Sequence, residues 1–84
     1  MPYSPIQCHL YDYIEIACMR HYHLDVELKS GEHLIGYAQN TQVKNKEEFL
    51  VFLISGVIQL IRLDKIKRIT ALDSNAEFSS VIIN

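Results

Sequence analysis

The chain has 84 residues, of which 49% are hydrophobic and 21% charged, so we expect residues 1–84 to form one folded domain. Its formal net charge of −2 differs from the basic excess that is typical of nucleic-acid-binding proteins. The longest apolar run, residues 49–54, is too short to span a membrane, and the first residues lack the basic start of a signal peptide. We therefore expect a cytoplasmic protein.

Residues 12–21 are predicted to form a single N-terminal helix, because apolar residues recur at helical spacing in this segment. Asp12 is followed three residues later by Glu15, which has the form of a capping box at a helix start. Capping is therefore one interpretation of these two carboxylates. The other is a protein-binding patch, since Tyr11 places an aromatic ring beside them.

A β-hairpin is predicted over residues 24–38, LDVELKSGEHLIGYA. Leu24, Val26 and Leu28 alternate with charged residues, which puts the apolar side chains on one face of a strand. The Ser-Gly pair at positions 30–31 can reverse the chain, because glycine tolerates the positive φ of tight turns. Such a hairpin is only marginally stable alone, so other elements must cover it.

The remaining segments alternate between strands and turns. Gly36 predicts a bulge or a bend in the second strand of the hairpin, and the polar residues 40–47 are predicted to form a loop. Further strands are expected at residues 49–54, 57–63 and 66–71 and, as a C-terminal tail or edge strand, within residues 76–84.

These elements predict a mainly β fold with one N-terminal helix. The economical arrangement is a small, strongly curved antiparallel β-barrel over about residues 22–72, capped by the helix. Closure of the barrel would remove the sheet edges that invite aggregation. The expected core consists of apolar residues along these strands: Leu24, Val26, Leu28, Leu50, Phe52, Ile61 and Ile69.

Metal binding and catalysis are not favoured by the sequence. Four histidines, at positions 9, 21, 23 and 33, lack the paired short spacings of zinc sites, so we expect surface histidines, no metal and no cofactor. Cys8 and Cys18 are expected to behave as small hydrophobic residues, with a disulfide between them as the alternative. There is no phosphate-binding glycine loop and no nucleophile elbow, and we expect no enzymatic activity.

Two short stretches carry many of the basic residues. Lys44, Asn45 and Lys46 form one, and the other runs from Arg62 to Arg68. A solvated surface is the simplest interpretation of both. Contact with RNA is the alternative, but no aromatic residue interleaves with the second stretch, as base stacking would require.

The order and spacing of several segments resemble those of a known family. The segments are YSPIQCHLYDYIEIAC, LDVELKSGEHLIGYA, EEFLVF and IRLDKIKRI, which lie within about residues 3–72. Together they are similar to the Rho-binding antiterminator family, Rof, also called YaeO. The most specific pieces are residues 8–18, 27–32 and 63–66.

The resemblance implies an Sm-like fold and a protein inhibitor of the bacterial transcription termination factor Rho. In this family the protein binds the N-terminal RNA-binding domain of the Rho hexamer, blocks its primary RNA site and hinders ring closure, which gives antitermination. The implied contacts lie on the helix and on a polar loop: Tyr11, Asp12, Glu15, Lys44, Asn45 and Lys46. The family often carries further acidic residues where this chain has His9 and Leu10.

The negative net charge suits a protein that competes with RNA for a basic surface better than one that binds RNA itself. We expect a monomer that competes with RNA in this way. The alternative is an Sm-like RNA-binding protein that acts directly on RNA. An RNA-binding assay at physiological salt separates the two.

Overall fold

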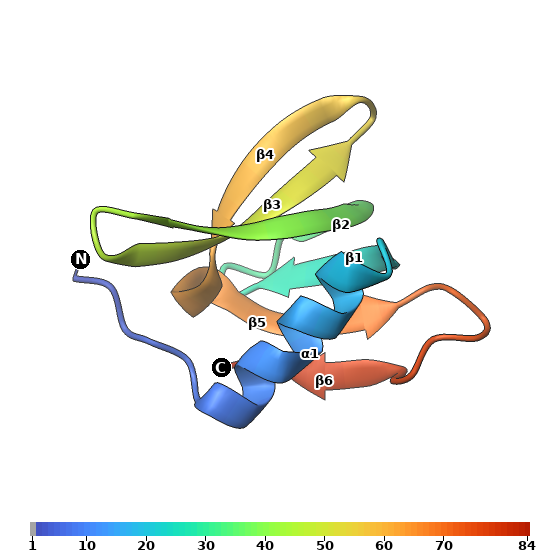
Figure 1. Ribbon diagram of the computed structural model, residues 1–84, viewed down its shortest axis with the longest axis horizontal. Coiled ribbons are helices and arrows are strands. Elements are labelled where there is room, and N and C mark those ends of the chain that lie inside the picture. Colours follow the sequence, from blue (N-terminus) through green and yellow to red (C-terminus); the bar gives the residue numbers. More distant parts are fainter. Residues whose placement is uncertain (1) are drawn as a thin grey trace.

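The computed structural model describes residues 2–84, and within them it contains one α-helix, one short 3₁₀ helix and one antiparallel sheet (Figure 1). The predicted class, mainly β with an N-terminal helix, is confirmed. In chain order the elements are α1 (Cys8–Met19), β1 (His23–Leu28), β2 (His33–Lys44), β3 (Glu47–Ile54), β4 (Val57–Arg62), the short 3₁₀ helix η1 (Leu63–Lys65), β5 (Ile66–Ala71) and β6 (Ser80–Ile82).

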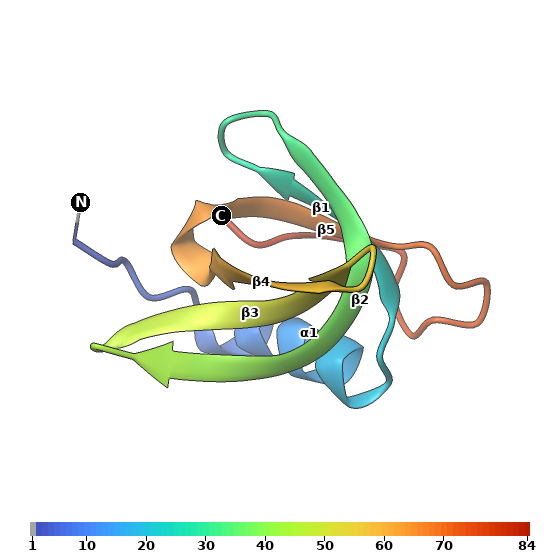
Figure 2. The same ribbon diagram turned by 90° about the horizontal axis from the view of Figure 1, so that it is seen from above.

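The sheet is strongly curved, but within residues 2–84 it does not close. Its strand order is β4-β3-β2-β1-β5-β6, so β4 and β6 form its two edges. The long strand β2 produces the curvature, because residues 33–37 pair with β1 and residues 37–44 pair with β3. Figure 2 shows β2 bending between these two partners. The expected barrel is therefore an open one with two free edges.

The bend in β2 involves two neighbouring features. The register with β3 shifts between Ala38 and Asn40, which is the mark of a bulge. Gly36, where the sequence predicted the bulge or bend, has a different role: a Cβ atom there would overlap the carbonyl oxygen of Leu53 and touch the ring of Phe52. Glycine is needed at this position because the backbones of β2 and β3 approach closely.

The predicted loop over residues 40–47 is wrong. β2 continues to Lys44 and β3 starts at Glu47, and only the two residues between them form a turn. Asn45 and Lys46 both have positive φ, 52° and 63°, which is the geometry of a tight hairpin turn. The prediction failed because it relied on polar composition. Residues 42–44 at the end of β2 are exposed on both faces, so they lack the alternation of buried and exposed residues that indicates a strand.

The core forms between the concave face of the sheet and α1. Six of the seven predicted core residues are buried, whereas Leu28 at the end of β1 is only half-buried. The helix adds Ile14, Ala17 and Cys18 to the same cluster. After the short strand β6, Ile83 is also buried and belongs to this cluster, so the C-terminal segment contributes to the core as well.

Candidate functional site

The helix that carries the predicted contacts starts earlier than the sequence suggested. α1 begins at Cys8, and the Gln7 carbonyl accepts hydrogen bonds from the backbone N–H groups of Leu10 and Tyr11, at 3.0 and 3.1 Å. The N-cap residue Gln7 makes no side-chain capping bond. Asp12 therefore lies inside the helix, and the predicted capping box is wrong. The segment before α1, residues 2–7, has no regular secondary structure and contacts distant residues, through Tyr3 to Glu48 and Ser4 to Asp64.

The three predicted helix residues lie together at one groove. Asp12 and Glu15 are exposed and Tyr11 is half-buried. Glu15 follows Asp12 by three residues and Tyr11 by four, so it neighbours both on the helix surface. They line a groove of about 410 Å³ that is completed by Pro5, Ile6, Cys8 and Glu48. Within residues 2–84, neither Asp12 nor Glu15 has a hydrogen-bonding or ionic partner on another side chain. Their carboxylates are thus available to a partner.

Glu48 is the member of this groove that the sequence did not reveal. It comes from β3, where it pairs with Val43, and its carboxylate accepts a hydrogen bond of 2.9 Å from the Tyr3 hydroxyl. Burial, followed by this bond, raises the pKa of Tyr3. The sequence offered no local signal for Glu48, because it lies 33 residues from Glu15 along the chain, between the predicted loop at 40–47 and the predicted strand at 49–54.

The predicted loop residues occupy a separate position. Lys44, Asn45 and Lys46 form the exposed tip of the β2–β3 hairpin, which extends away from the body of the sheet on the side of the N-terminal segment (Figure 1). None of the three lines the groove. The start of β3 connects the tip to the groove, because Glu48 follows Lys46 by two residues.

An ionic cluster holds the N-terminal segment in place. Arg62 donates two hydrogen bonds to Asp64, from Nε to Oδ1 at 2.9 Å and from Nη2 to Oδ2 at 2.6 Å. Asp64 Oδ2 also accepts a bond of 3.1 Å from the Ser4 backbone N–H. The Arg62 guanidinium lies 5.6 Å from the centre of the Tyr3 ring, within cation–π range. This cluster therefore positions Tyr3, and through it Glu48, at the groove.

The hydrogen bonds and charges of this cluster favour the ionised form of the Asp64 carboxyl group. Asp64 is buried, and the hydrogen bonds from Arg62 hold its pKa below the ordinary value, although burial acts in the opposite direction. A buried carboxylate is stable only when it is paired and hydrogen-bonded. Both requirements are met here, so the N-terminal segment is tied to η1 by a charged contact.

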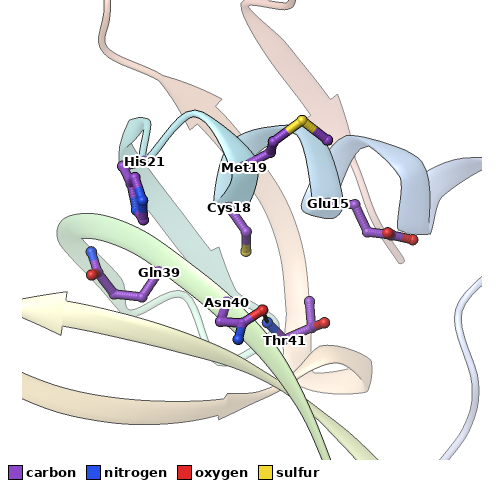
Figure 3. Close-up of a pocket in the computed structure, with 7 residues that line it drawn as sticks. All are labelled: Glu15, Cys18, Met19, His21, Gln39, Asn40 and Thr41. Atoms are coloured by element: carbon purple, nitrogen blue, oxygen red, sulfur yellow. Dashed lines mark hydrogen bonds between the residues drawn. The ribbon is translucent and has the colours of Figure 1, made fainter.

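A second cavity of about 400 Å³ lies between the C-terminal half of α1 and the bulge of β2 (Figure 3). Cys18 points from the helix toward the strand in this cavity. Burial, with a smaller contribution from Glu15, raises the pKa of the Cys18 thiol to about 12, so the thiol is protonated and unreactive at neutral pH. His21 Nδ1 lies 3.1 Å from the Ala38 carbonyl oxygen, to which it donates. This cavity offers no nucleophile.

Other classes of site receive no support from the described residues. Residues 2–84 contain no group of three or more His, Cys, Asp or Glu side chains that could hold a metal ion. Cys8 and Cys18 are both free. In this same part of the chain, no helix has the length and apolar character that crossing a membrane requires.

Comparison with known proteins decides the family. A family model described as "Modulator of Rho-dependent transcription termination (ROF)" matches residues 5–83. The chain belongs to the Rof family. It is 37% identical to "Protein rof" of Escherichia coli strain K12 over 82 residues, which are 98% of this chain and 93% of that protein, and equally similar to "Protein rof" of Shigella flexneri.

A solved structure extends the Rof likeness to the fold. It is described as "YaeO bound to Magnesium from Vibrio cholerae O395" and superposes with a TM-score of 0.81 at 32% sequence identity. The match covers 88% of this chain and 97% of the other. The resemblance read from the sequence segments is thereby confirmed, and this Rof-family chain belongs to a group of regulators of Rho-dependent transcription termination.

Proposed function

We propose that this protein binds the N-terminal RNA-binding domain of Rho, blocks RNA at the primary site and hinders closure of the Rho ring, so that termination is suppressed. The observation that carries the proposal is the groove at α1. Tyr11, Asp12 and Glu15 line one surface, and both carboxylates lack a partner within residues 2–84. A competitor of RNA at a basic surface must offer such groups.

Two parts of the structure contribute to the proposed interface. The groove supplies the carboxylates of Asp12 and Glu15, with Tyr11 as an aromatic contact. The hairpin tip with Lys44, Asn45 and Lys46 supplies a second, polar contact on a tight two-residue turn. Because the tip projects on the same side as the N-terminal segment, a single partner domain could contact both.

The alternative, direct binding of RNA, is weakened by the way the basic stretch is used. Arg62 is bonded to Asp64 and Glu47, and Arg68 lies 3.8 Å from Glu27. These guanidinium groups are partly neutralised inside the protein and contribute less to a phosphate-binding surface. A competitor of RNA remains the better-supported proposal.

The experiment compares binding of the wild-type protein and the double variant Asp12→Asn, Glu15→Gln to purified Rho. Each charge-assisted hydrogen bond that is lost costs about 1.5–3 kcal/mol, or tenfold or more in affinity per residue. We expect the double variant to lose displacement of a labelled pyrimidine-rich RNA from Rho. Since Asp12 does not cap the helix, the loss should come without unfolding, which circular dichroism checks.

The matched control is Glu32→Gln with Glu77→Gln, which changes the net charge equally at two exposed positions outside the groove. This control should bind Rho within about twofold of wild type, because exposed charges of this kind contribute little. A folded Asp12→Asn, Glu15→Gln variant that displaces RNA as well as the wild type would refute the proposed docking surface.

A further inference from the structure

Strand β4 is an unprotected edge of the sheet. β3 pairs along one side of it, from Ile54↔Val57 to Phe49↔Arg62, and within residues 2–84 no strand pairs along the other side. Such an edge offers unpaired backbone N–H and C=O groups to another strand. Proteins usually blunt it with charges, prolines, bulges or a very short strand.

Residues 57–61, VIQLI, carry none of these devices. They contain no charge and no proline, and their register with β3 is continuous. Arg62, the charged residue of β4, is held by Asp64 instead. The other edge, β6, has three residues, and the Asn84 side chain after it is bonded to two backbone carbonyls of the body. Of the two edges, β4 is the one left open to pairing.

Three of the four exposed side chains of β4 are apolar, and Gln59 is the polar one. Val57, Ile58 and Leu60 are 57%, 53% and 43% exposed. On the outer face, Ile58 continues a cross-strand row that contains Leu53 of β3 and Tyr37 of β2. The row ends at the free edge, so a strand added there would extend it with further cross-strand contacts.

The backbone of β4 alternates between its two sides. The Ser-Gly turn at 55–56 is closed by the pair Ile54↔Val57, and hydrogen-bonded pairs alternate along an antiparallel ladder. Gln59 therefore directs its N–H and C=O toward β3. Ile58 and Leu60 direct theirs toward the free side, where a new strand would pair.

The apolar pattern of this strand is the same in both directions about Gln59. If two copies pair antiparallel across a two-fold axis at Gln59, Ile58 faces Leu60 of the other copy, and Val57 faces Ile61. The two-fold axis repeats each of these two pairs, and both kinds of pair are apolar. The outward backbone groups of Ile58 and Leu60 are also in register. A two-fold interface requires this kind of self-complementary surface. The occupant that this edge fits is a second copy of the chain.

We infer that β4 is a self-association edge, through which two copies join their sheets about a two-fold axis at Gln59. This assembly differs from the monomer expected from the sequence. The groove at α1 shares no residue with β4, so the pair of molecules presents two grooves. The inference is independent of whether those grooves bind Rho.

The first test is sedimentation equilibrium of the full chain from ~10 µM to ~1 mM, a range that detects weak association. We expect the mass to rise from 9.7 kDa toward twice that value. The variant Ile58→Lys, Leu60→Lys places charges on the open edge and should stay monomeric throughout. The matched control Val43→Lys, at a 67% exposed position of β2, should associate like the wild type.

The second test uses disulfide crosslinking to locate the two-fold axis. In a Cys8→Ser background, Gln59→Cys should oxidise to a symmetric disulfide dimer, because residue 59 faces itself across a closely spaced pair. Position 57 is also exposed, but Val57→Cys faces residue 61, so this variant should crosslink at least tenfold more slowly. Equal crosslinking of both variants, or a monomeric mass at ~1 mM, would overturn the inference.

Hydrogen exchange distinguishes a second copy from another protein. The outward amides of Ile58 and Leu60 should become protected as the concentration of this protein rises, whereas the amide of Gln59 is protected by β3 at every concentration. If those two amides are protected only after Rho is added, the edge belongs to Rho and self-association is wrong.

Discussion

Asp64 is the residue on which the placement of the N-terminal segment depends. It is buried, and it links Arg62 of β4 to the backbone of Ser4, 60 residues away along the chain. Removing one partner of a buried ionic pair leaves the other charge without compensation. The contact therefore matters for stability and for the position of Tyr3 beside the groove.

We expect Asp64→Asn to lower the free energy of unfolding at pH 7 by about 1.5–3 kcal/mol, the range for hydrogen bonds to charged groups. Because folding lowers the pKa of Asp64, its contribution is fully present above the unfolded pKa near 3.9 and is lost as pH falls through the lower folded value. In urea titrations, the difference in the free energy of unfolding between wild type and variant should shrink as pH falls below the unfolded pKa near 3.9.

The control for this prediction is Glu77→Gln. Glu77 pairs with Arg20 at 3.4 Å in an exposed position, where such pairs contribute only about 0–1 kcal/mol. A pH-independent difference between wild type and Asp64→Asn would show that the ionised carboxylate is not the stabilising group.

At the scale of the element, α1 begins without a side-chain cap. Gln7 has the extended conformation of an N-cap, with φ −66° and ψ 143°, but its side chain does not bond the first turn. A serine at an N-cap satisfies one free N–H group. A side-chain cap at residue 7 would therefore stabilise the helix further.

We expect Gln7→Ser to raise the free energy of unfolding by about 0.5–1 kcal/mol, because the hydroxyl can cap the first turn. Gln7→Ala removes the same amide without adding a cap and should give no increase. Thermal unfolding of the three proteins checks this, and a lower melting temperature for Gln7→Ser than for Gln7→Ala would contradict it.

The strands supply a second comparison at this scale. Leu50 of β3 is fully buried, whereas Leu28 at the end of β1 is only half-buried. Leu50→Ala should therefore cost about 2–5 kcal/mol, as deletions in a packed core do, and Leu28→Ala clearly less. Urea denaturation of both variants measures the difference. Equal losses would mean that the end of β1 is packed as tightly as β3.

For the whole molecule, the distribution of charge differs between the two signs. The carboxylates of Asp12 and Glu15 at the groove have no side-chain partner among residues 2–84, whereas Arg62 and Arg68 are paired with acidic residues of the protein. A surface of this kind attracts a basic partner over distances comparable to the Debye length, which shrinks as salt increases. The rate of association is the quantity most sensitive to this attraction.

We expect the association rate with Rho to fall as salt is raised from about 0.05 M to 0.5 M, while the dissociation rate changes little. In the variant Asp12→Asn, Glu15→Gln the salt dependence should be weaker than in wild type. Stopped-flow measurements provide both rates. An association rate that is independent of salt would argue for a mainly apolar interface.

The sequence by itself determined the class of fold, most of the strands and the family. Alternation along residues 24–28 predicted β1, the glycines at 31 and 56 marked turns that the structure contains, and the spaced segments indicated Rof. These features are local, because strand periodicity and positive φ are properties of a few neighbouring residues. The predicted helix contacts also meet at one groove, although their role as Rho contacts stays a prediction.

Tertiary structure alone decided where α1 begins, how far β2 extends and which residues complete the groove. No side-chain cap marks the start of α1, and the segment before it is held by Asp64 from across the chain. Residues 42–44 at the end of β2 form a strand because β3 pairs with them, not because of their composition. Glu48 reaches the groove only through that same pairing. Long-range contacts choose between conformations that the local sequence permits. These three features therefore could not be predicted from any short segment of the sequence.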